Sequence, residues 1–175
     1  MFNRYGWAIV GASWATGNQI VHDDKQLYIS RATKNFHRSS VFVAGSGYDL
    51  IQAQFPDKTE TFAQFDKNAF SSLGYRSRKI TASWNCKIPI RGQAMLLTPN
   101  TLWVAGLPDE VPANAPYAAF EGVLGGKLLA FERETGDLLS DVTLNAPPVW
   151  DGLSVAASRI FVAQEDGKLV CLKLN

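Results

Sequence analysis

Imidazole and carboxylate side chains come together in the sequence at His22-Asp23-Asp24. Nitrogen and oxygen donors of this kind suit divalent cations, but three adjacent residues need further donors from elsewhere in the chain. When similar segments of the sequence are aligned with this one, the aligned residues are expected to form short turns. Asp is also favoured in β-turns. We therefore expect a turn here, with His22, Asp23 and Asp24 as secondary candidates for metal ligands.

The rest of the chain offers no arrangement typical of catalysis. It contains no Gly-x-Ser-x-Gly motif, no phosphate-binding glycine loop and no Cys/His pair. Cys86 and Cys171 are too far apart for a metal-binding spacing such as Cys-x-x-Cys. We expect two buried thiols, with a disulfide as the alternative, because free Cys is often buried. No catalytic or cofactor-binding residue is predicted, so an enzyme is not the favoured class.

Some polar and aromatic residues lie in turn-rich segments and are candidates for a binding surface. Aromatic rings in loops can contact a protein partner or stack on a sugar. For His37 and Arg38, simple exposure to solvent without a binding role is the alternative, because loops are usually polar whatever their role. The candidates are Trp14, His37, Arg38, Tyr117 and Phe120.

These residues must be positioned by the elements of a repeat. Asp166–Lys173 repeats Gly125–Glu132 position for position at a distance of 41 residues (125 to 166). Upstream of each copy, Ser158–Ala163 matches Asn100–Ala105 at a distance of 58 residues (100 to 158). The longer distance indicates an insertion in the Pro-rich run that starts at Leu107, where prolines oppose strand pairing. A strand-rich repeat of this period is typical of propeller blades.

Short runs of alternating apolar and polar residues fill most of the chain between Gly, Asp, Asn and Pro. This pattern predicts about a dozen strands, enough for about three four-stranded blades. Two fainter copies of the repeat are Lys25–Ser30 and Ser39–Ala44. The second of these is either part of another blade or a hairpin partner of the first.

Size and charge exclude several classes of function. The chain has 175 residues, of which 46% are hydrophobic, as expected for one globular domain. Its 17 basic and 16 acidic residues are interspersed and give a net charge of +1. Without a basic stripe, nucleic acid is not an expected partner. No apolar run is long enough for a signal peptide or a membrane span.

The sequence of residues 126–139, Gly-Lys-Leu-Leu-Ala-Phe-Glu-Arg-Glu-Thr-Gly-Asp-Leu-Leu, resembles the repeat of the PQQ-like (pyrroloquinoline-quinone-like) β-propellers. That repeat reads Gly-x-Leu-x-Ala-x-Asp-x-x-Thr-Gly-Lys-x-x-Trp, and Ala130, Thr135 and Gly136 match it. Ser140 stands where the family has the Trp that docks one blade on the next. The resemblance therefore implies a blade whose docking position has changed.

The resemblance implies an all-β fold, a partial propeller of four-stranded antiparallel blades in the quinoprotein-dehydrogenase-like superfamily. Thr135-Gly136 is expected to form a hairpin turn. The stretch Ala146–Gly152 is expected to connect an outer strand to the innermost strand of the next blade, with Asp151-Gly152 making the turn into that strand. We expect one domain, 1–175, with a blade-like part at 1–55, an inserted loop or short helix at 56–79, and blades at 80–175 that carry a Pro-rich insertion at 107–122.

Three blades are fewer than the four to eight that close a ring, and the last repeat stops before its outer strand. We therefore expect the chain to be the C-terminal part of a longer propeller. Its partners would be the missing N-terminal blades or a second copy of itself. The resemblance implies a periplasmic or extracellular location if the full-length parent is exported.

Three functions fit these observations. The favoured one is a non-catalytic propeller segment that serves as a binding or scaffolding surface for protein or other ligands. The second is a fragment of a quinone-dependent oxidoreductase, in which pyrroloquinoline quinone and calcium would lie on the propeller axis. The third is a glycan-binding module that uses Trp14, Tyr117 and Phe120. The changed docking position and the lack of an axial carboxylate set favour the first, without a cofactor.

Overall fold

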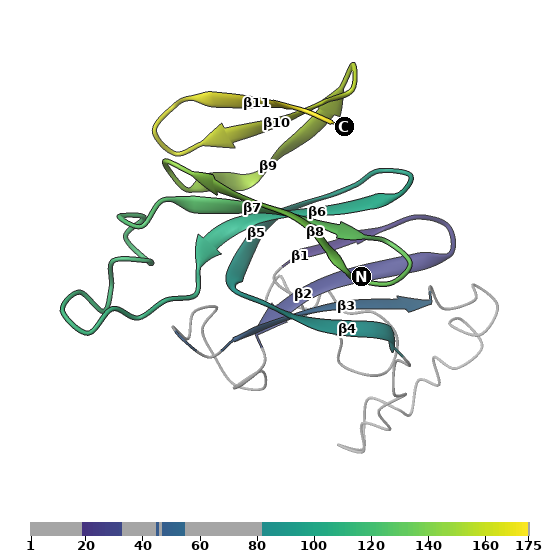
Figure 1. The fold of residues 1–175 in the computed structure, drawn as a ribbon, viewed down its shortest axis with the longest axis horizontal. Coiled ribbons are helices and arrows are strands. Elements are labelled where there is room, and N and C mark those ends of the chain that lie inside the picture. Colours follow the sequence, from purple (N-terminus) through teal and green to yellow (C-terminus); the bar gives the residue numbers. More distant parts are fainter. Residues whose placement is uncertain (1–18, 33–44, 46, 55–81, 175) are drawn as a thin grey trace, which may run out of the picture.

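The computed structural model describes residues 19–32, 45, 47–54 and 82–174. This part of the chain contains eleven strands and no helix, so the protein is all-β in its described residues. The strands form three antiparallel sheets that follow one another along the chain (Figure 1). None of the three sheets closes on itself. The fold class expected from the alternating pattern is confirmed at this level.

Each sheet is a meander in which consecutive strands are neighbours. The first sheet contains β1 (Gln19–His22), β2 (Gln26–Ala32), β3 (Tyr48–Gln54) and β4 (Ala82–Ile88). The second contains β5 (Ile90–Leu97), β6 (Thr101–Pro108), β7 (Gly126–Glu132) and β8 (Leu138–Leu144). The third contains β9 (Pro148–Ala156), β10 (Arg159–Gln164) and β11 (Leu169–Lys173).

The sequence repeat corresponds to equivalent positions in the sheets. β7 is the third strand of the second sheet, and β11 is the third strand of the third sheet. β6 and β10, which contain the upstream copies, are both second strands. The backbone confirms the match, because Arg133 N donates to Asn100 O and Leu174 N donates to Ser158 O at corresponding places. Among the described residues the third sheet has three strands, as expected for a last repeat without its outer strand.

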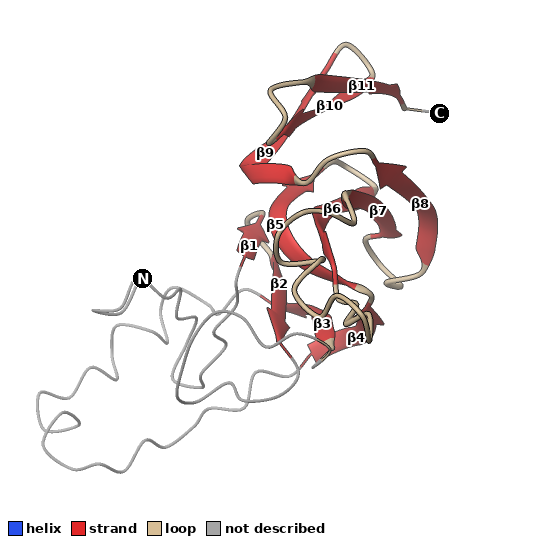
Figure 2. Ribbon diagram, turned by 90° about the vertical axis from the view of Figure 1, so that its left-hand side faces the viewer, coloured by secondary structure: helices blue, strands red, loops and turns tan. Residues whose placement is uncertain are grey.

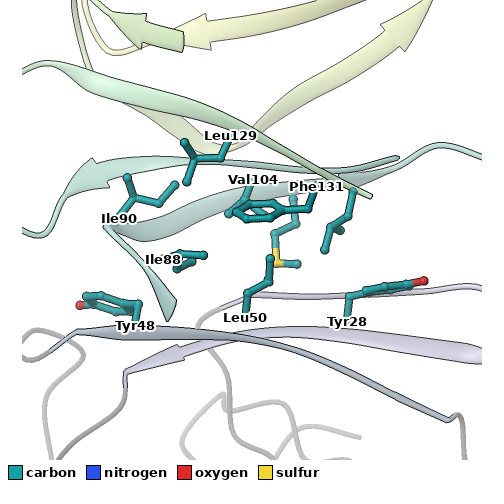
Figure 3. Close-up of a cluster of buried hydrophobic side chains, with 10 residues drawn as sticks. Tyr28, Tyr48, Leu50, Ile88, Ile90, Val104, Leu129 and Phe131 are labelled. Atoms are coloured by element: carbon teal, nitrogen blue, oxygen red, sulfur yellow. The ribbon is translucent and has the colours of Figure 1, made fainter. Parts of the chain in front are cut away.

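The first two sheets pack face to face through the largest core cluster (Figure 3). Tyr28, Leu50 and Ile88 from the first sheet meet Val104 and Phe131 from the second. These side chains are 0–3% exposed. Fully burying one such side chain contributes roughly 1.5–3 kcal/mol, so this layer is a main source of stability.

The opposite face of the second sheet packs on the third sheet through a second cluster. Its buried members include Leu128 and Leu144 from the second sheet and Ile160 and Val162 from the third. Alternation along each strand of the second sheet therefore serves two interfaces, one on each face. A smaller cluster of Leu27, Ile29 and Ile51 lies in the first sheet apart from both.

The first strands of the three sheets, β1, β5 and β9, lie next to one another. A direct hydrogen bond joins two of them, from Gln19 Nε2 to the carbonyl of Gln93 at 2.7 Å. Figure 2 shows the stack from the side, with β5 between β1 and β9. The sheets are therefore stacked with corresponding edges together.

Two expected boundaries are wrong. The connection before the third sheet is shorter than 146–152, because β9 begins at Pro148. Asp151-Gly152 lies inside β9 as a bulge, where Asp151 has a φ of 55° and pairing with β10 shifts register. A Cβ on Gly152 would lie 2.6 Å from Val149 Cγ2, so the bulge requires glycine there. Similarly, Leu107 and Pro108 belong to β6, and the irregular loop covers 109–125.

Other expectations lie outside the described residues. These are the loop or short helix at 56–79 and the strand at Ser39–Ala44. Within the described residues, β2 pairs with β1 on one edge and β3 on the other.

Candidate functional site

Arg133 lies in the turn between β7 and β8, and its guanidinium reaches across to the first sheet. Nη2 donates to a carboxylate oxygen of Asp23 and to Oε1 of Gln26, the latter at 3.1 Å. Nε donates to the hydroxyl of Tyr28 at 3.1 Å, and the guanidinium lies 5.5 Å from the centre of that ring. The Arg133 side chain is 15% exposed, so this ion pair is partly removed from water. Such a pair is stronger than one on an open surface.

The same residue also binds a turn of its own sheet. Nη1 of Arg133 donates to the carbonyls of Thr98 and Pro99, at 3.3 and 3.0 Å. Arg133 therefore joins three turns, β1–β2, β5–β6 and β7–β8, at one end of the stack. We call this group of contacts the Arg133 junction.

Trp84 of β4 adds a second link at the Arg133 junction. Its indole Nε1 donates to the carbonyl of Arg133 at 2.9 Å. The ring lies against Gly136, where a Cβ would come within 2.7 Å of Trp84 Cε3. Gly136 also has a φ of 79° in the expected Thr135-Gly136 turn. A side chain at this position would therefore both strain the backbone and displace the indole.

The position of Trp84 corresponds to that of Ser140 in the next sheet. Trp84 is the third residue of β4 and pairs with Gln52, while Ser140 is the third residue of β8 and pairs with Ala130. A register shift follows immediately in both pairs of strands. The sequence indicated a missing docking Trp at Ser140, but it did not reveal that Trp84 makes a docking contact one sheet earlier.

Of the three residues first considered as metal ligands, His22 ends β1, and Asp23 and Asp24 lie in the turn to β2. Asp23 Oδ1 accepts from the backbone N–H groups of Lys25 and Gln26, at 2.8 and 2.7 Å. The Lys25 hydrogen bond lowers the pKa of Asp23; burial opposes this, and the Gln26 N–H and Arg133 add to it. His22 and Asp24 are exposed. The hydrogen bonds that Asp23 accepts, together with the backbone bond from Asp23 N to Gln26 O at 3.0 Å, confirm the expected turn. No group of three or more potential metal ligands is found among the described residues.

A different carboxylate organises the opposite end of the stack. Asp109, the first residue of the 109–125 loop, accepts hydrogen bonds from the backbone N–H groups of Gly45 and Gly47, both at 2.8 Å. Its own N–H donates to the carbonyl of Pro89 at 2.9 Å. The loop is therefore fixed to the segment that precedes β3 in the first sheet.

The 109–125 loop also approaches the third sheet. A Cβ on Gly122 would lie 2.7 Å from Pro147 and 3.9 Å from a carboxylate oxygen of Glu165. Ala118 and Ala119 of the loop are buried. The loop thus spans the second sheet between its two neighbours. Figure 1 shows it extending beyond the strands, between the end of β6 and the start of β7.

Large apolar side chains of this loop face solvent. Tyr117 is 65% exposed and Phe120 is 53% exposed. Val111 and Val123 are 48% and 73% exposed. The structure therefore places both sequence-predicted aromatic residues on an anchored loop, with more than half of each side chain exposed.

Near this end, Arg91 of β5 lies under Trp150 of β9, with 5.7 Å between the guanidinium carbon and the ring centre. Arg91 is 8% exposed, whereas Trp150 is 48% exposed. The buried Tyr48 lies in the same region, where burial raises its pKa to about 12 despite the positive charge of Arg91. Tyr48 is therefore neutral at physiological pH and is not suited to be a base.

Both cysteines are free thiols, so the disulfide alternative is wrong. Burial, together with the negative charges of Asp49 and Asp137, raises the pKa of Cys86 to about 11. A thiol with so high a pKa is a poor nucleophile at neutral pH. Cys171 lies exposed on β11, contrary to the expectation that both thiols are buried.

The remaining candidates, Trp14, His37 and Arg38, lie outside the described residues. Sequence reasoning missed Arg133, Trp84 and Asp109 as organising residues. A lone Arg, Trp or Asp carries no pattern that reveals a partner more than 45 residues away in the chain. Their roles follow from the stacking of the sheets.

No protein-family model matches the chain, and no curated protein matches it. No helix of the described residues is long and apolar enough to cross a membrane. What the described residues offer is a rigid stack with an anchored loop carrying exposed aromatic side chains. This arrangement can support recognition.

Proposed function

We propose that the chain is a non-catalytic, PQQ-like propeller segment that serves as a scaffold and presents binding loops. Its sheets would be successive blades, with β1, β5 and β9 nearest the propeller axis. The repeated meanders, their face-to-face packing and the adjacent first strands support this proposal. The Trp84–Gly136 contact supports it further, because it joins the first two sheets as a blade-docking Trp would.

The observation that carries the scaffold proposal is the outer face of the third sheet. In the repeat, Leu169 and Cys171 correspond to Leu128 and Ala130 of the second sheet. Leu128 is 0% exposed because the third sheet covers it, whereas Leu169 is 64% exposed. Phe161 of β10 lies beside Cys171 in register and is partly exposed. Part of this face is therefore apolar, with Leu169, Cys171 and Phe161 beside the positively charged Arg159 and Lys173. Apolar residues of this kind are typical of a face that another sheet covers.

The partner on this face would be a further sheet of the same type, supplied by more blades of a longer protein or by a second copy. The test is sedimentation of the full chain, which we expect to self-associate through this face. Replacing Leu169→Lys should shift the population toward monomer without changing the β-sheet signal in circular dichroism. The exposed Leu139 of β8, at 58%, provides a matched control, Leu139→Lys. A monodisperse wild-type monomer that binds no hydrophobic dye would contradict the proposal.

The scaffold role implies that neither pyrroloquinoline quinone nor calcium binds the isolated chain with useful affinity. Calorimetric titration with both compounds checks this. A micromolar response would favour the oxidoreductase alternative instead.

A further inference from the structure

The 109–125 loop combines exposed apolar side chains with a one-sided charge. Residues 92–126, which include this loop, contain no Lys, Arg or His. The same stretch contains three acidic residues, Asp109, Glu110 and Glu121. In a chain with 17 basic and 16 acidic residues, this separation of charge is confined to residues 92–126, because Arg91 and Lys127 lie directly on either side. It favours a positively charged partner over a negative one.

The acidic side chains at the loop surface are available for a ligand. Glu110 and Glu121 are exposed, and so is Glu165, which lies near Gly122. None of these three carboxylates has an ion-pair partner among the described residues. The carboxylate of Asp109, in contrast, accepts hydrogen bonds from the backbone N–H groups of Gly45 and Gly47. One carboxylate thus anchors the loop, two exposed carboxylates belong to it, and that of Glu165 lies close to it at Gly122.

A tight turn brings the apolar and acidic groups together. The N–H of Glu121 donates to the carbonyl of Tyr117 at 2.9 Å, which closes one turn of chain. Because residues three and four apart on a helix-like turn lie on the same side, we expect Tyr117, Phe120 and Glu121 to lie near one another. Ala118 and Ala119, between them, point inward and are buried. The anchored turn therefore presents two rings and a carboxylate with little conformational entropy left to lose on binding.

We propose that this loop surface binds a protein segment in which arginine alternates with apolar residues. Arginine fits because its planar guanidinium can stack on Tyr117 or Phe120 while it pairs with Glu121 or Glu110. The apolar residues of the segment would cover Val123, which is 73% exposed. This inference rests on the proposed function, because it assigns a ligand class to a loop of the scaffold.

The test uses fluorescence anisotropy with the full chain and a dye-labelled peptide, Gly-Arg-Leu-Arg-Phe-Arg-Gly. Two matched peptides replace either all Arg by Glu or Leu and Phe by Ser. We expect the first peptide to bind and both controls to bind at least about tenfold more weakly, as is typical when central contacts are lost. Equal binding of the Glu peptide would overturn the proposal.

Variants of the protein locate the surface. The double variant Tyr117→Ala/Phe120→Ala should weaken binding by about tenfold or more, and Glu121→Lys should weaken it and reduce its dependence on salt. The control Leu138→Ala/Leu139→Ala removes side chains of similar exposure, 55% and 58%, from β8 and should leave binding unchanged. Circular dichroism confirms the fold of each variant. The same loss in control and loop variants would contradict the assignment.

A glycan is the other occupant that exposed aromatic rings could accept. Binding of chitohexaose that requires Tyr117, without binding of the Arg peptide, would overturn the proposal in favour of a sugar site. The scaffold is tested separately by the Leu169→Lys sedimentation experiment. If the chain self-associates but binds no peptide, the scaffold proposal stands and the proposed ligand is wrong. If the chain is a monomer that binds the peptide, the proposed ligand stands and the scaffold proposal is wrong.

Discussion

The two interfaces of the second sheet differ in how they are held. Both bury apolar side chains from neighbouring sheets. The interface with the first sheet adds the Arg133 junction, with its ion pair to Asp23 and the docked indole of Trp84. At the interface with the third sheet, Leu174 takes the position that corresponds to Arg133 and packs into the apolar cluster. At equivalent backbone positions, Arg133 thus makes polar contacts with the first sheet, whereas Leu174 makes apolar contacts with the second.

The repeat therefore specifies the path of the backbone more strictly than the side-chain contacts that hold neighbouring sheets together. Directional hydrogen bonds hold the first two sheets in one relative position, because each donor of Arg133 has a defined acceptor. Apolar contacts tolerate small shifts more readily, since they have no directional requirement. We expect the first interface to be the more rigid of the two.

Removing Trp84 should have the largest effect. Trp84→Ala leaves a cavity beside Gly136 and removes the donor to the Arg133 carbonyl. Truncation of a packed Trp typically costs about 3 kcal/mol or more of unfolding free energy. Urea denaturation measures it. A loss below about 1 kcal/mol would show that the docking contact contributes little to the first interface.

Arg133→Leu makes the first interface resemble the second at the corresponding position. The change removes the contacts with Asp23, Gln26 and Tyr28, but a leucine can keep some packing. We expect a loss of about 2 kcal/mol, since part of the ion pair faces solvent. A double-mutant cycle with Asp23→Asn isolates the pair. Additive effects in that cycle would mean that the pair with Asp23 contributes nothing and that Arg133 acts through its other contacts.

Trp150→Ala removes the aromatic partner of Arg91 at the second interface. Because Trp150 is 48% exposed, we expect a loss of about 1 kcal/mol, which combines partial burial with a partly solvated cation–π contact. The comparison with Trp84→Ala by the same denaturation experiment tests the difference between the interfaces directly. A larger loss of unfolding free energy for Trp150→Ala than for Trp84→Ala would contradict the expected difference between the two interfaces.

The smallest effect should appear as a dependence on pH. The folded-state pKa of Asp23 is lowered, so the stabilisation from its carboxylate is present above the ordinary value of 3.8 and is lost as pH falls through the folded pKa. The stability difference between wild type and Asp23→Asn should therefore be constant near neutral pH and shrink below pH 3.8. Denaturation from pH 7 to pH 2.5 measures it. A difference that grows toward low pH would contradict this sign.

The sequence predicted the strands and turns much better than the contacts between the sheets. The 41-residue repeat and the alternating pattern predicted the strands of the second and third sheets, because both depend on residues close together in the chain. The turn at Asp23 followed from local preference in the same way. The bulge at Asp151-Gly152 was missed, because Asp-Gly is typical of a turn and only the pairing of β9 with β10 shows otherwise.

The candidate site was predictable in part for the same reason. Tyr117 and Phe120 stood out because a Pro-rich insertion must lie at the surface, and the structure confirms their exposure. The anchoring of that loop by Asp109 depends on amides 62 and 64 residues away, which no local pattern indicates. The exposure of Cys171 was missed because its strand lacks a covering sheet among the described residues, although its apolar pattern is that of a covered strand.

The Arg133 junction also has a consequence for the order of folding. Most strand pairs join segments that are close in sequence, whereas Arg133 contacts Tyr28 and Asp23 across 105 and 110 residues. Contacts between distant segments require the closure of long loops and tend to form after local hairpins. We expect the meanders to form first and the junction to close over them late. Weakening it would then accelerate unfolding while leaving the folding rate nearly unchanged, so the junction would determine mainly how long the native state lasts.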